Sequence, residues 1–512
     1  MTQASHPPRS KGLPVAVVKL LAGNVVVTGC NVLRDVAVAA TLGASVSADY
    51  FFLAISIPVC VISVAGGSYR SVVVPFLVGK TDSAQGATIS AATRLTWLNV
   101  LGVVWVSGLS GAVLASAYLV ARGSAASSAS APLLRAMLMV IPMYAFSAFV
   151  EMSQGVLQAV GALVGPNLSR AALPAGIVLG VGLLGAGSGI LGLILGGTLG
   201  AMMGALVVAW QLSRHGMRIR GGSTRLPKAE AQHFLRNFRA LAIATSITHL
   251  APLISQWLAG LLGPGSVSAL GYASRLTIGA GSLISGAFAP VLLGYFATES
   301  GSSDPAPVRR TFIDFATLFA WTGCCMTLGF WTTSEYLIQV IYQRGALTDT
   351  NAHHVAVLAN YYAPQFPLLL AATAATAMIS GRALNRVFVP INAILLVSNL
   401  ILSIILMTVL STGGIALASS LTYALSLGLL MATLIRRGVV SADRTSLLRF
   451  VTPFALLTCA GAVVFAGDLR VTKNTGLMQY AGATLVVIVF LVVAFASNRA
   501  FIVRAFARSR RS

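Results

Sequence analysis

The feature that most constrains this chain is a series of about fourteen apolar runs, each close to the length that spans a membrane. A helix needs about 20 mostly apolar residues to cross the hydrocarbon core of a bilayer. Within that core the backbone polar groups must be paired inside the protein, and a helix pairs its own. The runs therefore predict an all-α polytopic membrane protein with about 14 transmembrane helices.

Composition supports this class. Of the 512 residues, 56% are hydrophobic and only 9% are charged, whereas a typical soluble domain has about 25% charged residues. So few charges cannot cover the surface of a soluble protein of this size. The composition excludes a soluble enzyme, a disordered chain and a nucleic-acid-binding domain.

Two basic linkers divide the runs into predicted domains. Residues 13–212 form an N-terminal lobe of six helices, 213–233 a cytoplasmic basic linker, 234–435 a second six-helix lobe, and 447–503 two further helices. The runs are Leu13–Ala40, Ala48–Val78, Leu95–Ala121, Leu133–Val160, Leu168–Leu184, Ile190–Leu212, Phe234–Leu262, Val267–Thr298, Thr311–Thr333, His354–Ser380, Val387–Leu410, Ile415–Ile435, Leu447–Ala466 and Leu477–Ala496. Two lobes of six helices are typical of transporters built from repeats around a central cavity.

The charge distribution predicts the orientation. The chain has 34 Lys and Arg against 12 Asp and Glu, a net charge of +22. Most of the cations fall in one alternate set of the segments between the runs, which is the pattern of cytoplasmic loops. We therefore expect a multi-pass membrane protein with both termini in the cytoplasm. Membrane lipids, and no nucleic acid, are the expected surroundings.

Neither an enzyme nor a metal site is predicted. The five cysteines lie inside apolar runs without a CxxC pair, so we expect no metal and no cofactor. The longest predicted outside loop, residues 334–353, carries only Glu335, Asp349 and His353 as candidate acid–base groups. A polytopic transferase or polymerase usually needs a larger outside loop, so this alternative is disfavoured.

One glycine pattern and several ionisable residues stand out inside the runs. Glycines at 192, 196, 200 and 204 form a smooth stripe, which predicts close helix packing or a sliding surface. An ionisable group at the membrane centre costs about 2.5–3.5 kcal/mol on insertion scales, so each one needs a reason. We interpret Asp35 as a partner of Arg34, and Arg170 as a side chain that extends to the cytoplasmic face. Glu151 and Asp35 are candidates for a coupling role.

Arg34 and Arg275 occupy equivalent places in the two predicted lobes. If both face one central cavity, their planar guanidinium groups suit a phosphate or pyrophosphate. The sequence therefore predicts an anion site that includes these two arginines.

Four stretches then occur in a characteristic order. They are Arg34-Asp35 with Gly43 and Ala48-Asp49-Tyr50-Phe51-Phe52-Leu53-Ala54, then Tyr272-Ala273-Ser274-Arg275-Leu276, Arg344-Gly345-Ala346-Leu347, and Gly414-Ile415-Ala416-Leu417-Ala418-Ser419-Ser420-Leu421. In these stretches the chain resembles the MurJ/MviN lipid II flippases of the MOP superfamily. The resemblance spans almost the whole chain.

The resemblance implies fourteen helices around a central cavity in the bacterial inner membrane, and the flipping of an undecaprenyl-pyrophosphate-linked saccharide from the cytoplasmic to the periplasmic leaflet. It implies that Arg34, Asp49 and Arg275 are cavity residues. Other cations of the family pattern are absent, since Thr28, Ile62 and Ser63 stand in their places. Arg70, about two turns along the second run from Ile62 and Ser63, is a candidate to compensate, although this is not the favoured interpretation.

Sequence reasoning leaves three functions open. The first is a flippase for a lipid II-like peptidoglycan precursor that works by alternating access. The second is a flippase or exporter of another lipid-linked glycan, such as an exopolysaccharide. The third is a transport-inactive membrane scaffold, and each of the three allows cell-wall or polysaccharide synthesis enzymes as partners.

Overall fold

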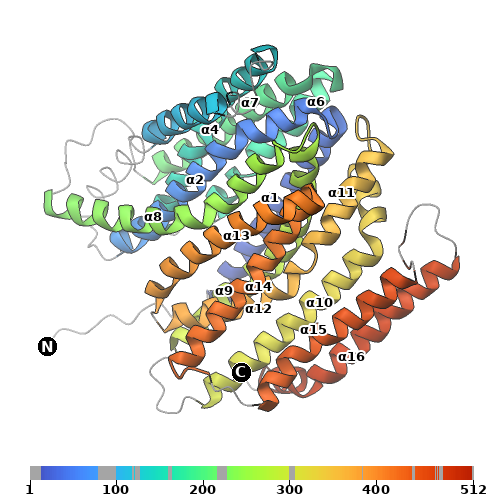
Figure 1. Ribbon diagram of the computed structural model, residues 1–512. Helices are drawn as coiled ribbons and strands as arrows, with labels where there is room; N and C mark the ends of the chain where they lie inside the picture. The colour runs from blue at the N-terminus through green and yellow to red at the C-terminus, as the bar shows by residue number, and fades with distance from the viewer. Residues whose placement is uncertain are drawn as a thin grey trace, which may run out of the picture. The chain divides into compact units, whose positions relative to one another are not determined.

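The computed structural model describes residues 13–78, 100–117, 120, 127–159, 164–215, 228–298, 306–382, 384–440, 444–467, 469, 471 and 477–509. The regular elements in these residues are helices, without a strand among them. Figure 1 shows their course. They are α1 (Leu13–Leu42), α2 (Val46–Val78), an unlabelled helix (Val100–Ala117), α4 (Ser127–Ala159), α5 (Val164–Ser169), α6 (Ala172–Leu184), α7 (Gly189–Arg214), α8 (Lys228–Ala259), α9 (Ser266–Thr298), α10 (Ala306–Tyr342), α11 (Asp349–Tyr362), α12 (Gln365–Gly381), α13 (Phe388–Leu410), α14 (Thr412–Arg436), α15 (Arg444–Ala466) and α16 (Leu477–Ser509).

The prediction of an all-α polytopic fold is confirmed. Twelve of the described helices are long and apolar enough to cross a membrane. The predicted run His354–Ser380 is a thirteenth candidate, made of α11 and α12 with a bend of 41° between them. The predicted run Leu168–Leu184 differs, because it breaks after α5 and leaves α6 with only 13 residues.

The bend between α11 and α12 has a local cause. Pro364 precedes α12 and has no N–H to continue the hydrogen bonds of α11. Neighbouring helices satisfy carbonyl groups around the break. Thr327 Oγ1 in α10 donates to Ala363 O at 2.9 Å, and Ser420 Oγ in α14 donates to Tyr361 O at 2.8 Å. Such pairing makes a broken helix tolerable at membrane depth.

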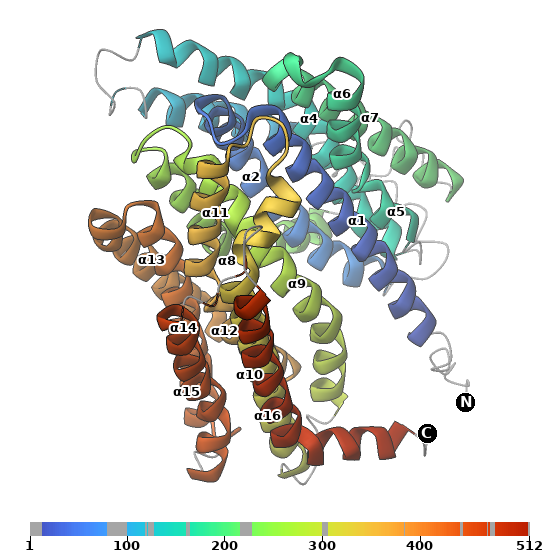
Figure 2. The ribbon, with the colours of Figure 1, turned by 90° about the vertical axis from the view of Figure 1, so that its right-hand side faces the viewer.

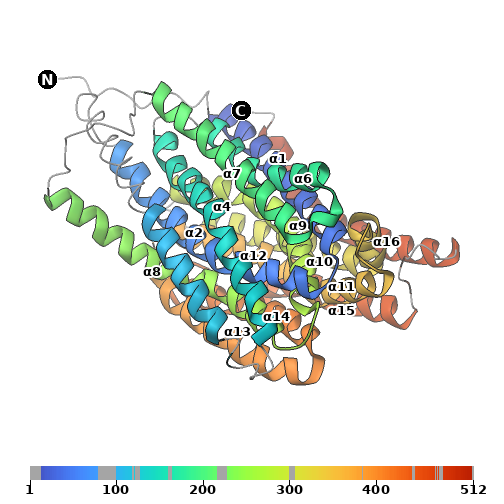
Figure 3. The same ribbon diagram turned by 90° about the horizontal axis from the view of Figure 1, so that it is seen from above.

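The first compact unit covers Met1–Leu253. Within it α4 packs between α2 and α7, while α1 contacts α5 and α6, and Figure 3 shows α2, α4 and α7 in this order. The glycine stripe of α7 packs inside the unit against glycines of α6. A Cβ at Gly180 would lie only 2.7 Å from both Gly192 O and Gly196 Cα. The prediction of close helix packing is confirmed.

The second compact unit covers Ile254–Ser512. The 37-residue helix α10 contacts α11, α12, α15 and α16, and Figure 2 shows α15 and α16 alongside it. The ring of Trp321 lies 5.4 Å from that of Phe490, which fixes α16 on α10. An apolar core of this unit includes Phe296, Phe312 and Met378. The predicted boundary at linker 213–233, of which residues 216–227 lie outside the described residues, stays a prediction.

Candidate functional site

A cavity of about 450 Å³ lies within the first unit, between α1, α2, α4, α6, α7 and α8. Apolar side chains form part of its wall. Its polar lining consists of Asn31, Arg34, Ser63, Arg70, Tyr144, Ser147, Glu151, Ser169, Arg170, Thr245 and His249. The lining therefore contains three guanidinium groups and, among the described residues, one carboxylate. Such a surplus of cations favours an anionic ligand over a metal ion.

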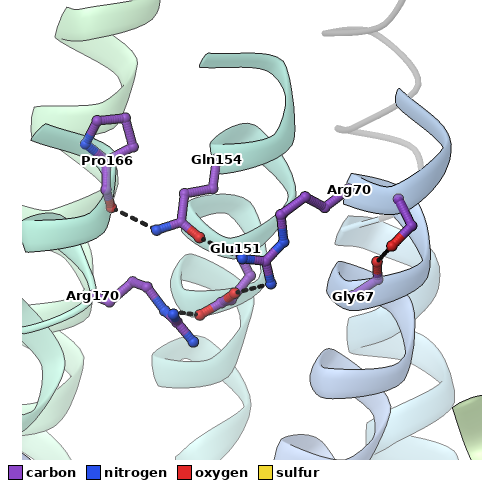
Figure 4. A network of polar contacts seen from close by, with 7 residues as sticks. Gly67, Arg70, Glu151, Gln154, Pro166 and Arg170 are labelled. Carbon is purple, nitrogen blue, oxygen red and sulfur yellow. Dashed lines mark hydrogen bonds and ion pairs between the residues drawn. The ribbon is translucent and has the colours of Figure 1, made fainter. Parts of the chain in front are cut away.

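Three charged side chains of this lining form one network, shown in Figure 4. Arg170 Nε donates to Glu151 Oε1 at 2.6 Å. Arg70 Nη2 lies 3.8 Å from Glu151 Oε2, so the carboxylate sits between the two guanidinium groups. The side chains keep exposed fractions of 35% for Arg170, 31% for Arg70 and 19% for Glu151. All three therefore remain accessible from the cavity they line.

A buried glutamine, Gln154, holds Arg70 of this network in place. Gln154 lies one turn after Glu151 in α4, and its Nε2 donates to Pro166 O in α5 at 3.0 Å. Its Oε1 lies 3.5 Å from Arg70 Nη1 and accepts a hydrogen bond from it. Because its amide is fixed by a backbone carbonyl, Gln154 orients Arg70 toward Glu151.

Close packing of α2 on α4 explains why these charges meet. A Cβ at Gly155 would lie 3.0 Å from Arg70 Cα, and a Cβ at Gly66 would lie 3.1 Å from Glu151 Cβ. Glycine at both positions lets the two helices approach closely. The approach brings Arg70 of α2 beside Glu151 of α4.

A second charged pair lies on α1. Arg34 donates to Asp35 Oδ1 from Nε at 3.0 Å and from Nη2 at 2.8 Å. Asp35 is buried, with 3% of its surface exposed, whereas Arg34 lines the cavity. The prediction that Asp35 is the partner of Arg34 is confirmed. The structure also brings Arg34 and Arg70 to the same cavity, although the expectation that they bind a substrate remains a prediction.

Two predicted site residues lie elsewhere. Asp49 is buried in the first turn of α2, where a carboxylate favours the positive end of the helix dipole. It does not belong to the described lining of the cavity. Arg275 lies in α9 of the second unit and is partly buried. Its predicted role with Arg34 stays a prediction.

The interpretation of Arg170 as a side chain that extends to the cytoplasmic face did not include a partner in the protein, and the extension itself stays a prediction. Arg170 occupies the turn between α5 and α6, where the predicted run is interrupted, and it binds Glu151 in the cavity. Sequence reasoning also missed Gln154. Its position three residues after Glu151 on the same helix face is the one signal that indicates a shared polar site.

The chemistry of the site follows from its geometry. Guanidinium groups present planar pairs of N–H donors that match phosphate oxygens. Hydrogen bonds to ionised groups in a partly desolvated site are roughly twice as strong as neutral ones. The cavity is suited to bind a phosphate-bearing ligand and to orient it through more than one arginine.

Comparisons with known proteins indicate what the chain is similar to. The sequence matches the family model described as "Lipid II flippase MurJ" over residues 38–488. A relative, the probable lipid II flippase MurJ of Vibrio cholerae serotype O1 (strain ATCC 39315 / El Tor Inaba N16961), is 26% identical over 455 residues. The match covers 85% of this chain and 84% of the relative.

Solved structures share the fold. The lipid II flippase MurJ in an inward closed conformation superposes with a TM-score of 0.77 at 19% identity, over 95% of this chain and 100% of that one. A multidrug resistance MATE family transporter of the MOP superfamily matches in an inward-facing conformation with a TM-score of 0.67, at 10% identity over 83% and 98% of the two chains. An outward-facing conformation of such a transporter matches with a TM-score of 0.56, at 12% identity over 88% and 96%.

Proposed function

We infer, from the premise that this chain belongs to the MurJ family of lipid II flippases, that it translocates a polyprenyl-pyrophosphate-linked saccharide of the lipid II type. The match over residues 38–488 confirms the resemblance in the sequence. The family is one of transporters, so the chain is not an enzyme. It is a multi-pass protein of the inner membrane.

One observation carries the proposal for this chain, namely the cavity that Arg34, Arg70 and Arg170 line together. A pyrophosphate bears at least two negative charges and several acceptor oxygens. Three guanidinium groups around one volume supply matching donors, and they outnumber the two carboxylates that pair with them, Asp35 and Glu151. Arg70 and Arg170 are our candidates to stand in for the cations of the family pattern that are absent at Thr28, Ile62 and Ser63.

Each predicted site residue has a proposed role. Arg34 and Arg70 bind the pyrophosphate, and Arg275 of the second unit contributes a further cation during the transport cycle. Asp35 orients Arg34, which it contacts at 2.8 Å. Asp49, in the first turn of the helix that carries Arg70, orients or gates the arginines. Glu151, which contacts both Arg70 and Arg170, is the candidate for coupling.

Alternating access is the proposed mechanism. Structural relatives are described in inward closed, inward-facing and outward-facing conformations, which supports two states of the same fold. In the inward state the cavity accepts the headgroup from the cytoplasmic leaflet, and in the outward state it releases it. Both termini lie in the cytoplasm, where most of the cations of the predicted loops lie. The partners are the membrane enzymes that make and use the lipid-linked saccharide.

Reconstitution tests the proposal. Purified full-length protein in vesicles should accelerate the translocation of a fluorescent lipid II, read as label that becomes accessible at the outer surface. A fluorescent phosphatidylglycerol should not be accelerated. Faster translocation of a polyprenyl-linked exopolysaccharide unit than of lipid II would favour the other glycan. No acceleration of any pyrophosphate-linked saccharide would contradict transport and favour the scaffold.

A further inference from the structure

The carboxylate of Glu151 occupies the place of an anion between two cavity arginines. Its Oε1 accepts from Arg170 Nε at 2.6 Å, and its Oε2 lies 3.8 Å from Arg70 Nη2. Each oxygen thus faces a different guanidinium group, and the two arginines come from different elements, α2 and the turn before α6. A phosphate group bound by both arginines would be bridged in the same way.

The arginines are held for this arrangement by other contacts. Gln154 fixes Arg70 through its Oε1 at 3.5 Å, and α5, which leads into Arg170, is fixed to Gln154 through Pro166 O at 3.0 Å. The close contact at Gly155 fixes the backbone of Arg70. The two guanidinium groups therefore converge on one point by virtue of the fold, and Glu151 supplies the charge that offsets their repulsion.

All three charged groups line the cavity and are partly exposed to it. An ion pair with a solely structural role has no need to face the space where a ligand enters. A carboxylate at the edge of the cavity can be replaced by a ligand of higher charge, because one carboxylate carries a single negative charge. A pyrophosphate carries more charge and more acceptor oxygens, and it can engage both arginines while Glu151 turns away.

We propose that Glu151 is an internal substitute anion that occupies a second phosphate site, formed by Arg70 and Arg170, until the pyrophosphate of the lipid-linked substrate displaces it. This proposal rests on the proposed function, since it names how that substrate is recognised. The carboxylate sets a threshold of charge for entry. Anions with a single charge, such as phosphatidylglycerol, gain too little to displace it, so Glu151 determines specificity as well as affinity.

Displacement also explains how the substrate leaves. A site with uncompensated arginines would hold a pyrophosphate tightly and release it slowly. The return of Glu151 to Arg70 and Arg170 competes with the headgroup and favours release. Neutralising Glu151 should therefore tighten binding of the pyrophosphate and slow translocation. A variant that only destabilises the fold would not show tighter binding.

The test measures binding of polyprenyl pyrophosphate, inorganic pyrophosphate and phosphatidylglycerol to the full-length protein in neutral-lipid nanodiscs at fixed salt. Glu151→Gln should bind polyprenyl pyrophosphate about 10-fold more tightly, which is 1.4 kcal/mol. Its preference over phosphatidylglycerol should fall. Arg70→Ala and Arg170→Ala should each bind about 10- to 100-fold more weakly, because each loses a hydrogen bond to a charged group. If Glu151→Gln binds inorganic pyrophosphate more tightly than the wild type but binds polyprenyl pyrophosphate equally, the lipid-linked substrate is not the displacing ligand and the proposal is overturned.

Matched controls separate the charge at this site from charge in general. Glu335→Gln removes a carboxylate that pairs with His353 at 3.3 Å in the second unit, and Arg437→Ala removes an exposed cation after α14. Neither should change binding. The double variant Glu151→Gln/Arg170→Ala should lose the tighter binding of polyprenyl pyrophosphate that Glu151→Gln shows. Without Arg170, the phosphate site that Glu151 occupies no longer exists.

The outcomes distinguish this proposal from the proposed function. If the wild-type protein binds no lipid-linked pyrophosphate, the proposed function fails. If the wild type binds it and Glu151→Gln binds it equally or more weakly, the substitute-anion proposal fails while the function stands. If Glu151→Gln does not fold, Glu151→Asp replaces it in the test. The shorter carboxylate cannot reach both arginines, so this variant should also bind polyprenyl pyrophosphate more tightly than the wild type. Unchanged or weaker binding by that variant overturns the proposal.

Discussion

The packing of α6 on α7 predicts that alanine destabilises the protein at one glycine of α6, Gly180, and does not destabilise it at another, Gly182. Gly180→Ala places a Cβ 2.7 Å from Gly192 O and 2.7 Å from Gly196 Cα, both backbone atoms that cannot rotate away. Carbon atoms pack best at about 3.5–4.0 Å, so the helices must separate by about 1 Å. Overpacking of this kind costs about 1–3 kcal/mol.

The expected consequence is a loss of stability in the first unit. Helices in a bilayer associate mainly through close packing, because lipid is as apolar as their side chains. For a unit of this size each kcal/mol lowers the melting temperature by about 2–4 °C, so the variant should melt about 2–12 °C below the wild type. Translocation should fall too, because α6 and α7 supply Leu173, Pro174 and Ala201 to the cavity wall.

Gly182→Ala is the matched control, because a Cβ there meets nothing within 4 Å. Alanine is favoured over glycine inside a helix by roughly 0.5–1 kcal/mol, so this variant should keep or slightly raise the melting temperature. The assay is thermal unfolding of purified protein in one detergent, followed by loss of the monodisperse peak. Equal melting temperatures for the two variants would refute the packing argument.

Three further predictions concern the site and its orientation. Gly155→Ala places a Cβ 3.0 Å from Arg70 Cα, so it should displace Arg70 and reduce translocation. The control Gly102→Ala, whose Cβ meets nothing within 4 Å, should not. Equal translocation rates for the two variants would show that the contact at Gly155 does not position Arg70. Arg275→Ala should reduce translocation about 10-fold or more through the loss of a charged hydrogen bond, and a wild-type rate would remove Arg275 from the site. Reporter fusions at Val440 and at Gly221 should read cytoplasmic, and fusions at Gly413 and at Ala126 periplasmic. A periplasmic signal at Gly221, which like Ala126 lies outside the described residues, would contradict the two-lobe topology.

The sequence predicts the membrane-spanning elements well, because hydrocarbon thickness dictates the length of an apolar run. It predicts their interruptions less well. The run Leu168–Leu184 remains apolar across the break at Arg170, and the run His354–Ser380 remains apolar across Pro364. A hydropathy pattern does not distinguish a continuous helix from two that meet at an angle.

The site was predictable in part. Arg34 and Asp35 are neighbours in the chain, so their pairing follows from local sequence, and the structure agrees. The cluster of Arg70, Glu151 and Arg170 depends on how α2, α4 and α5 pack, and sequence spacing cannot supply that. Glycines at 66 and 155 permit this approach, but nothing in the sequence indicates which helix each of them faces.

The central claim is that arginines of the first-unit cavity bind the pyrophosphate of a transported lipid. Translocation of labelled lipid II by reconstituted Arg34→Ala and Arg70→Ala, with Arg437→Ala as the exposed control, tests it most directly. With equal amounts of protein in the vesicles, both cavity variants should translocate lipid II at less than about a tenth of the wild-type rate. Each variant loses a hydrogen bond to a charged group, which contributes about 1.5–3 kcal/mol. Arg437→Ala should match the wild type. Wild-type rates from both cavity variants would contradict the account.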